Sequence, residues 1–390
     1  MSRRDPLLVP RMAEHSTSIF GEMSALAARV GAINLGQGFP DTDGPQELKI
    51  VAETAIDEGR GNQYPPAHGL LELREAIAFH QERFYGIHLN PVTDVVVTTG
   101  ASEALQSALL ALIEPGDEVV MFEPWFDIYA AGISLARGTR VSVPLGGTDY
   151  RPDIDALRAA ITPRARILLI NSPHNPSGMI WSREDMLSLQ DILAPTDIIL
   201  ISDEVYEHMV YAPNQHWSAA HFDGLAARAF IVSSFGKTYH VTGWKVGTVA
   251  APAALTAEFR KVHQFNVFTV NTPMQHALAR YMADAKPYLE LPAFYQRKRD
   301  LFRQGLAKTK FKLLPGEGTY FQCVDISELA VPEKNLSDAD FCQWLTTDMG
   351  VAAIPLSAFY GNGFDQKVIR FCFAKQDATL LTALDRLAKL

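Results

Sequence analysis

One segment of the chain, residues 233–245, concentrates side chains that could do chemistry. It contains two lysines, Lys237 and Lys245, among hydroxyl groups and glycines, and it follows the apolar run 229–232, which is typical of a buried strand. Open α/β sheets bind their ligands at the carboxyl ends of such strands. Apolar surroundings lower the pKa of a lysine and free its amine for Schiff-base chemistry, so Lys237 is predicted to be a nucleophile. Lys245 could balance the charge of a phosphate.

Two further charged residues lie in or beside apolar runs. Asp203 follows the run 198–202, where a carboxylate either caps a helix or lies buried beside a positive partner. Arg370 lies within the run 368–373, so its guanidinium must form an ion pair inside the protein or face a cavity. The residues alone leave these alternatives open.

Four more segments accompany the lysine-containing segment: 34–41, 172–178, 202–206 and 369–374. Together they resemble the class I/II aminotransferases of fold type I, which depend on pyridoxal 5′-phosphate (PLP), and the resemblance extends from about Ile19 to the C-terminus. Within this superfamily the segments are most similar to the methionine aminotransferases of bacteria and to the related kynurenine aminotransferases. The resemblance implies that PLP is the cofactor.

The same resemblance implies a catalytic role for three residues. Lys237 would bind the aldehyde of the cofactor and, once a substrate amine displaces it, move a proton between the substrate Cα and the cofactor. Asp203 would keep the pyridine nitrogen protonated, which makes the ring withdraw electrons. Tyr206, together with Asn175, would donate hydrogen bonds to the ring oxygen. Asn175 lies between two prolines, and from the residues alone it could equally be a turn residue.

The phosphate of PLP is expected to contact two segments. Gly100, Ala101 and Ser102 follow a predicted strand, and backbone N–H groups at the start of the next helix bind anions. The resemblance adds Ser234 and Lys245 from the lysine-containing segment. Many aminotransferases have arginine at the position of Lys245, and lysine keeps the positive charge but loses the bidentate geometry.

Two aromatic residues also match the family. Phe126 would stack on the pyridine ring, although its neighbour Trp125 is a rival and ordinary core packing would explain either residue. Tyr64 matches the tyrosine that reaches the phosphate of the neighbouring subunit. The active form is therefore expected to be a homodimer with its sites at the subunit interface.

For the substrate, Arg370 would bind the α-carboxylate through two hydrogen bonds, assisted by Asn175 and the backbone of Gly38. Relatives specific for dicarboxylates place an arginine of the partner subunit in the side-chain pocket, and the comparable segment 262–279 contains none. Candidate pocket residues are apolar or aromatic instead: Ile19, Phe20, Phe39, His263, Phe265 and Phe268. The predicted substrate is therefore a neutral amino acid, such as methionine, an aromatic amino acid or a kynurenine-like one.

The predicted function is transfer of the α-amino group of such an amino acid to a 2-oxo acid by a ping-pong mechanism. A PLP-dependent β-lyase acting on cystathionine or cysteine conjugates is the alternative on the same scaffold, and release of pyruvate and ammonia would identify it. A PLP-binding regulator would carry an N-terminal DNA-binding domain, for which the N-terminal segment is too short. A nicotinamide-dependent Rossmann enzyme would need a G-x-G-x-x-G motif after its early strands, and the sequence has none there.

Composition limits the partners and the location that we expect. The formal net charge of −9, without any run rich in Lys and Arg, argues against a nucleic-acid partner. The three widely spaced cysteines predict buried free thiols in a cytoplasmic protein, and they lack the spacing of a zinc site. Residues 1–10 do not have the pattern of a signal peptide, and no apolar run reaches membrane-spanning length.

The elements that must position these residues form two groups. Short apolar runs that alternate with helical patterns from residue 94 to 232 predict a mostly parallel sheet with helices on both faces, in an α/β fold. Further strands are predicted at 311–314, 319–324, 351–355 and 368–373. We expect a large PLP-binding domain, 46–285, and a small α+β domain formed by an N-terminal arm and helix (1–45) together with 286–390. Ser18 is predicted to cap that helix.

Overall fold

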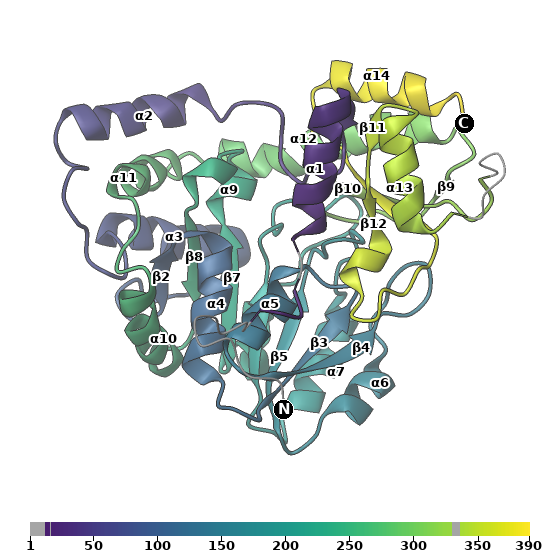
Figure 1. Cartoon of the computed structure of the whole chain (residues 1–390). Coiled ribbons are helices and arrows are strands. Elements are labelled where there is room, and N and C mark those ends of the chain that lie inside the picture. Colours follow the sequence, from purple (N-terminus) through teal and green to yellow (C-terminus); the bar gives the residue numbers. More distant parts are fainter. Residues whose placement is uncertain (1–11, 16, 330–335) are drawn as a thin grey trace, which may run out of the picture.

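The computed structural model of the chain describes residues 12–15, 17–329 and 336–390 (Figure 1). Residues 1–11 of the predicted N-terminal arm lie outside the described residues. In the described part, no helix combines the length and the apolar character that crossing a membrane requires.

A central sheet of seven strands carries the ends at which the candidate residues lie. Its strands, in order across the sheet, are β2 (Val95–Thr98), β8 (Gly247–Ala250), β7 (Ala229–Ser234), β6 (Ile199–Asp203), β5 (Ala165–Asn171), β3 (Glu118–Glu123) and β4 (Thr139–Pro144). The strands from β7 to β4 are parallel, whereas β8 is antiparallel to both of its neighbours. The predicted mostly parallel sheet is confirmed, but β8 was not among the predicted strands.

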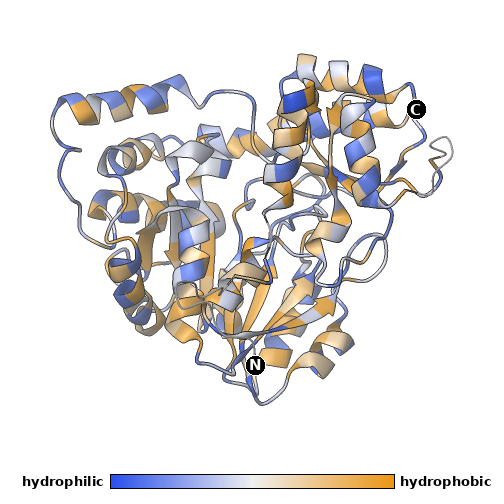
Figure 2. Ribbon diagram, viewed as in Figure 1, coloured by the Kyte–Doolittle hydropathy of each residue, from blue (hydrophilic) through white to orange (hydrophobic). Residues whose placement is uncertain are grey.

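Helices cover both faces of this sheet, because each inner strand is apolar on both sides (Figure 2). In β3, Val119 and Met121 belong to the core beneath one group of helices, and Val120 and Phe122 belong to the core beneath the other. The first group is α4 (Gly100–Leu112), α5 (Ile128–Leu135) and α10 (Ala253–Asn266), and the second is α6 (Ile154–Ala160) and α7 (Arg183–Leu193).

At one end of the sheet, α11 (Thr272–Tyr281) packs against both α2 (Gln46–Asp57) and α3 (Leu71–Tyr85). Short helical turns follow the central strands: η1 (Ala219–His221), α8 (Asp223–Ala226), α9 (Phe235–Thr238) and η2 (Thr242–Trp244). Because α9 begins directly after β7, it holds Lys237 at the carboxyl edge of the sheet.

The C-terminal part forms a second, antiparallel sheet in the order β12 (Ile354–Pro355), β13 (Val368–Cys372), β10 (Phe321–Asp325) and β9 (Lys312–Leu313). Its helical elements are α12 (Lys286–Leu306), α13 (Asp338–Thr347), η3 (Leu356–Phe359) and α14 (Asp377–Leu387). The single strand predicted at 351–355 is wrong: β11 (Val351–Ala352) leaves this sheet and pairs in parallel with β1 (Ile33–Asn34).

Through that pairing, the N-terminal helix α1 (Ile19–Val30) lies beside α13 (Figure 1). Ser18 precedes the helix as predicted, but its side chain makes no capping hydrogen bond and donates to Asp127 Oδ2 instead, at 2.7 Å. The division into domains at residues 46 and 286 stays a prediction.

The absence of a side chain at Gly247 lets strand β8 lie close to both the start of α4 and the end of β7. A Cβ atom at Gly247 of β8 would lie 2.8 Å from the backbone of Gly100, Ala101 and Ser233. Only glycine allows β8 to pass this close to the first turn of α4. The start of α4 is thereby fixed beside the end of β7.

Candidate active site

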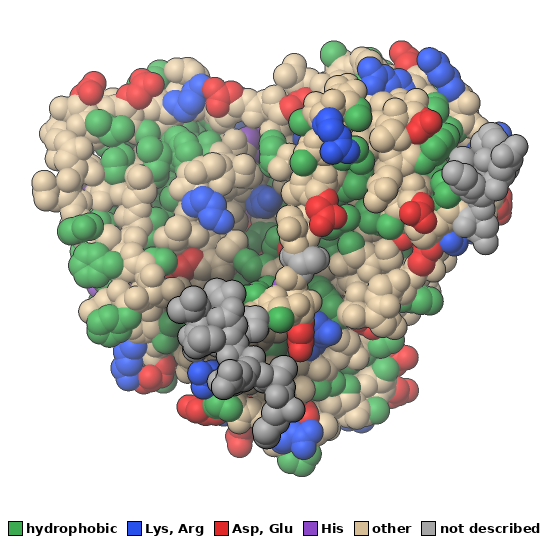
Figure 3. All heavy atoms as spheres, viewed as in Figure 1, with side chains coloured by type: hydrophobic (Ala, Val, Ile, Leu, Met, Phe, Trp, Pro, Cys, Tyr) green, Lys and Arg blue, Asp and Glu red, His purple; other side chains and the backbone are tan. Residues whose placement is uncertain are grey.

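A cavity of about 330 Å³ opens between the carboxyl edge of the central sheet and the C-terminal part. Figure 3 shows the molecular surface hollowed there, with Lys and Arg side chains in the hollow. The predicted residues that line it are Gly38, Gly100, Ala101, Ser102, Phe126, Asn175, Asp203, Tyr206, Ser234, Lys237, Lys245 and Arg370. Its charged lining residues are Asp203 and three cations, a balance that favours an anionic ligand.

Lys237 lies at the centre of this constellation. Its Nζ donates to the carbonyl oxygen of Gly38 at 3.2 Å and to the hydroxyl of Tyr320 at 3.0 Å. Burial is the main cause that lowers the pKa of the amine, to about 8. A lysine with this pKa is neutral more often near pH 7 than an exposed one, which suits attack on a carbonyl carbon.

Asp203 ends β6 and is buried, with 2% of its surface exposed. Its Oδ2 accepts from the hydroxyl of Tyr129 at 2.6 Å, and its Oδ1 accepts from the N–H of Val205 at 3.3 Å. No helix begins at Asp203, so the alternative of a helix cap is wrong. Burial raises the pKa of this carboxyl group to about 6, since neither neighbour brings a positive charge.

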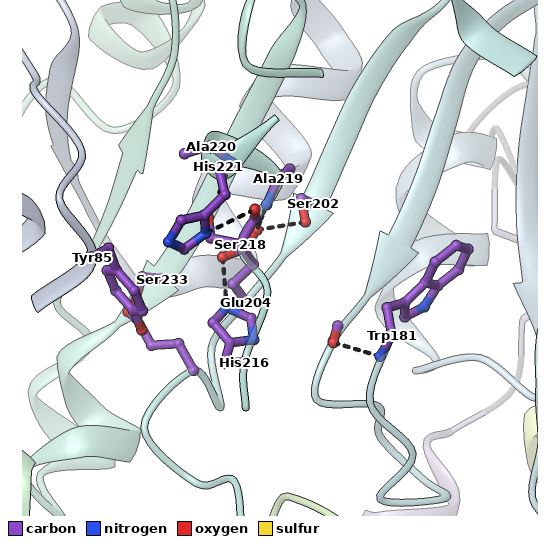
Figure 4. A network of polar contacts seen from close by, with 12 residues as sticks. Tyr85, Trp181, Ser202, Glu204, His216, Ser218, Ala219, Ala220, His221 and Ser233 are labelled. Carbon is purple, nitrogen blue, oxygen red and sulfur yellow. Dashed lines mark hydrogen bonds and ion pairs between the residues drawn. The ribbon is translucent and has the colours of Figure 1, made fainter. Parts of the chain in front are cut away.

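A buried polar network holds the turn that follows Asp203 (Figure 4). The carboxylate of Glu204 accepts from Ser202 Oγ at 2.8 Å, from His216 Nε2 at 2.9 Å and from the N–H of Ala219 at 3.0 Å. Glu204 follows Asp203 and precedes Tyr206 by two residues, so these hydrogen bonds hold the turn that carries both residues.

Beside this network, His80, Glu207 and His208 have the residue types of a metal site, and their ligand atoms lie within 4.8 Å of one another. Both oxygens of Glu207 already accept hydrogen bonds, from Tyr85 and Ser233. The three residues line a separate small cavity of about 40 Å³, away from Lys237. We therefore assign them to the packing behind the sheet.

Arg370 is completely buried in β13. Its Nη1 donates to Asn175 Oδ1 at 2.6 Å, its Nη2 donates to the carbonyl oxygen of Gly36 at 2.9 Å, and its guanidinium lies 3.9 Å from the ring centre of Phe321. No carboxylate among the described residues forms an ion pair with it, so the alternative of an internal salt bridge is wrong. Its charge is thus available to an anion in the cavity.

The start of α4 has the features of an anion site. Thr99, at the N-cap position, makes no side-chain hydrogen bond to the helix, which leaves its first N–H groups available. Lys245 adds a positive charge, with its Nζ 3.3 Å from Ser102 Oγ. An anion cradle, a buried carboxylate and a buried amine within one cavity fit the phosphate, the ring nitrogen and the aldehyde of PLP.

Three aromatic candidates for contacts with the cofactor can be compared with this geometry. Phe126 lines the cavity, whereas Trp125 is buried outside it beneath Arg140, so Trp125 is excluded as the stacking residue. Tyr64 lies outside the cavity, 80% exposed, with its ring edge-on to Phe268 at 5.1 Å.

The structure places the predicted substrate-pocket residues differently, and only one of them lines the cavity. Phe20 lines the cavity, but Ile19 and Phe39 do not. His263 was a wrong candidate, because it is buried and bonded to Glu103 and to the carbonyl oxygen of Ala67. Phe265 and Phe268 point outward and are 86% and 50% exposed.

Two tyrosines of the site were missed by the sequence analysis. Tyr129 lies three residues after Phe126, a spacing of one helical turn that could have suggested it. Tyr320 directly precedes β10 of the other sheet, and no spacing in the sequence relates it to Lys237, so only the tertiary structure brings them together.

Replacing Asp203 by asparagine should stabilise the cofactor-free protein at pH 8. A carboxyl group whose pKa is raised on folding makes the folded protein less stable as the pH rises from the group's unfolded pKa of 3.8 to its folded pKa of about 6. The variant lacks that loss, so the difference in free energy of unfolding should grow between pH 4 and pH 8, by on the order of 2 kcal/mol. Denaturant unfolding measures it, with exposed Asp191→Asn as the control for loss of one charge. A difference that is the same at both pH values contradicts this interpretation.

Comparisons with known proteins agree with this geometry. The chain matches the family model for aminotransferase class I and II over residues 30–387. It is 46% identical to the methionine aminotransferase of Escherichia coli (strain K12), over 98% of this chain and 99% of that protein. It is 33% identical to kynurenine–oxoglutarate transaminase 3 of Homo sapiens, over 93% of this chain and 86% of that protein.

Solved structures show the same fold. The structure of YbdL from Escherichia coli, described as having a methionine aminotransferase function, matches with a TM-score of 0.95 and 46% identity, over 98% of this chain and 100% of that chain. N-succinyldiaminopimelate aminotransferase from Mycobacterium tuberculosis matches with a TM-score of 0.93 and 41% identity, over 98% and 99%. The predicted fold, transaminase activity and PLP dependence are confirmed, and the chain belongs to the aminotransferase class I and II family.

Proposed function

We propose that this PLP-dependent aminotransferase takes its amino group from a neutral amino acid, either methionine or an aromatic or kynurenine-like one, and gives it to a 2-oxo acid. The lining of the cavity is the observation that supports this choice. Beside Arg370 it presents Phe20, Phe126 and Phe321, and among the described lining residues there is no second arginine for a side-chain carboxylate. The names of the methionine and kynurenine relatives agree with it, whereas the β-lyase alternative has no support among the relatives compared.

We further propose the following division of roles around the cofactor. Bound PLP supplies an electron sink for the bond between the substrate Cα and its hydrogen. Lys237 would hold the aldehyde carbon, and its freed amine would be the base that takes and returns the proton of Cα. Asp203 would keep the ring nitrogen protonated, and Tyr206 and Asn175 would donate hydrogen bonds to the ring oxygen. Phe126 stacks on the ring.

The two anionic groups would occupy opposite ends of the cavity. The N–H groups of Gly100, Ala101 and Ser102 would hold the phosphate, with Ser234 and Lys245 beside it. The substrate α-carboxylate binds Arg370. Asn175 Oδ1 already accepts from Arg370, which leaves the amide nitrogen of Asn175 free to donate to the carboxylate or to the ring oxygen.

A homodimer completes the proposal. Tyr64 and Phe268 are in contact and exposed, Phe265 is exposed as well, and exposed aromatic residues are typical of subunit interfaces. In a dimer, Tyr64 would reach the phosphate of the partner's cofactor.

We also propose a cytoplasmic location, because all three cysteines are buried and free, as is usual in a reducing compartment.

The substrate proposal predicts a clear preference in the first half-reaction. PLP-loaded protein should convert to its amine form with methionine or phenylalanine, with kcat/KM about 100-fold higher than with aspartate, because a second carboxylate would be buried without a partner. Absorbance of the cofactor follows the conversion, and Lys237→Ala should abolish it. The products should be the 2-oxo acid and no ammonia. Equal rates with aspartate would overturn the substrate assignment, and release of ammonia would support the lyase alternative.

The dimer proposal predicts complementation between two inactive variants. Lys237→Ala lacks the amine and Tyr64→Ala weakens the neighbouring phosphate site, so each variant alone should be impaired. When the two chains are unfolded, mixed and refolded, the mixed dimer contains one site with both residues intact. Activity should recover toward one quarter of the wild-type value, since about half of the dimers are mixed and each has one active site. If mixing restores no activity, Tyr64 does not act across the interface.

A further inference from the structure

The hydroxyl group of Tyr320 lies against the reactive amine of Lys237. Tyr320 belongs to the C-terminal part, directly before β10, and is completely buried. Its hydroxyl donates to the carbonyl oxygen of Gly38 at 2.6 Å, and Lys237 Nζ lies 3.0 Å from the same hydroxyl oxygen. Neither Tyr320 nor Gly38 belongs to the elements that carry Lys237.

Counting hydrogens determines the direction of these bonds. A tyrosine hydroxyl has one hydrogen, and here Gly38 accepts it. The lone pairs of the Tyr320 oxygen are then left to accept from the amine of Lys237. The carbonyl oxygen of Gly38 accepts from the amine as well, at 3.2 Å, so the amine rests on two acceptors.

Packing keeps both acceptors in place. The ring of Tyr320 is edge-on to Tyr206 at 5.3 Å and contacts Tyr295 at 5.6 Å, which restricts its rotation. At Gly38, an added Cβ atom would lie 2.9 Å from the ring of Phe321, so the absence of a side chain lets this carbonyl approach. The amine also lies 5.6 Å from the ring centres of Tyr206 and Tyr320.

We propose that the hydroxyl of Tyr320, together with the carbonyl of Gly38, holds the amine of Lys237 in place whenever it is not bonded to the cofactor, and so makes Tyr320 a positioning residue for the proton transfer. This rests on the proposed role of Lys237. The amine takes the proton from the substrate Cα, Tyr320 accepts a hydrogen bond from the resulting ammonium, and the same proton is then delivered to the cofactor. Tyr320 neither gains nor loses a proton, because burial raises the pKa of its hydroxyl well above its usual range.

The test compares Tyr320→Phe with Tyr295→Phe. The second variant is the matched control, since it removes a buried hydroxyl that bonds to His240 and does not touch Lys237. In cofactor-free protein, the pH dependence of acylation at Lys237, followed by mass spectrometry, gives the pKa of the amine. Without the Tyr320 acceptor, the ammonium is less stabilised and this pKa should fall by about one unit below the wild-type value.

A second readout uses the loaded enzyme. For Tyr320→Phe, kcat should fall about tenfold with little change in KM, and the isotope effect on kcat with Cα-deuterated methionine should rise because proton transfer becomes slower. Tyr295→Phe should change neither quantity. The proposal is overturned if either the pKa of Lys237 or the isotope effect in Tyr320→Phe equals that of the control. If wild-type protein transaminates no amino acid, the proposed function fails, while the pKa measurement still tests the contact between Tyr320 and Lys237.

Discussion

The site depends on two groups of opposite charge type that are buried without adequate partners in the protein itself. Asp203 ends β6, and Lys237 follows β7, the neighbouring parallel strand. Burial raises the pKa of the carboxyl group and lowers the pKa of the amine, so the charged form of each group is less stable here than in water. A ligand with a cationic nitrogen at one end and a carbonyl carbon at the other would relieve both costs, so the cavity fits such a cofactor.

The surrounding structure serves to keep those two groups in position. Behind Asp203, the buried carboxylate of Glu204 is held by three hydrogen bonds, and Tyr129 fixes one oxygen of Asp203 itself. Across the cavity, Arg370 is held by Asn175, the Gly36 carbonyl and the ring of Phe321, and no carboxylate in the described part of the chain forms an ion pair with it. Polar groups in these places cost folding energy that an apolar core would save, which is typical of functional sites.

Much of the fold and of the site could be predicted from the sequence, for physical reasons that also explain the errors. The central parallel strands are continuous apolar runs, and the carboxyl ends of neighbouring parallel strands must meet, which brings Asp203 and Lys237 together. Strand β8 was missed because it is short and begins with Gly247. The run 351–355 was predicted as one strand because the sequence does not reveal that its two halves pair with different partners, β1 and β13. Tyr320 was missed and His263 was wrongly chosen for the same reason: contacts between segments that are distant in the chain leave no local pattern in the sequence.

The central claim is that one amine, that of Lys237, forms the covalent bond to the cofactor. The most direct test is to load the protein with PLP, reduce it with borohydride, digest it and locate the pyridoxyl group by mass spectrometry. The account predicts a single labelled peptide that carries the group on Lys237, and no label in Lys237→Ala. Labelling of Lys245 or of any other lysine in place of Lys237, or no labelling at all, would contradict it.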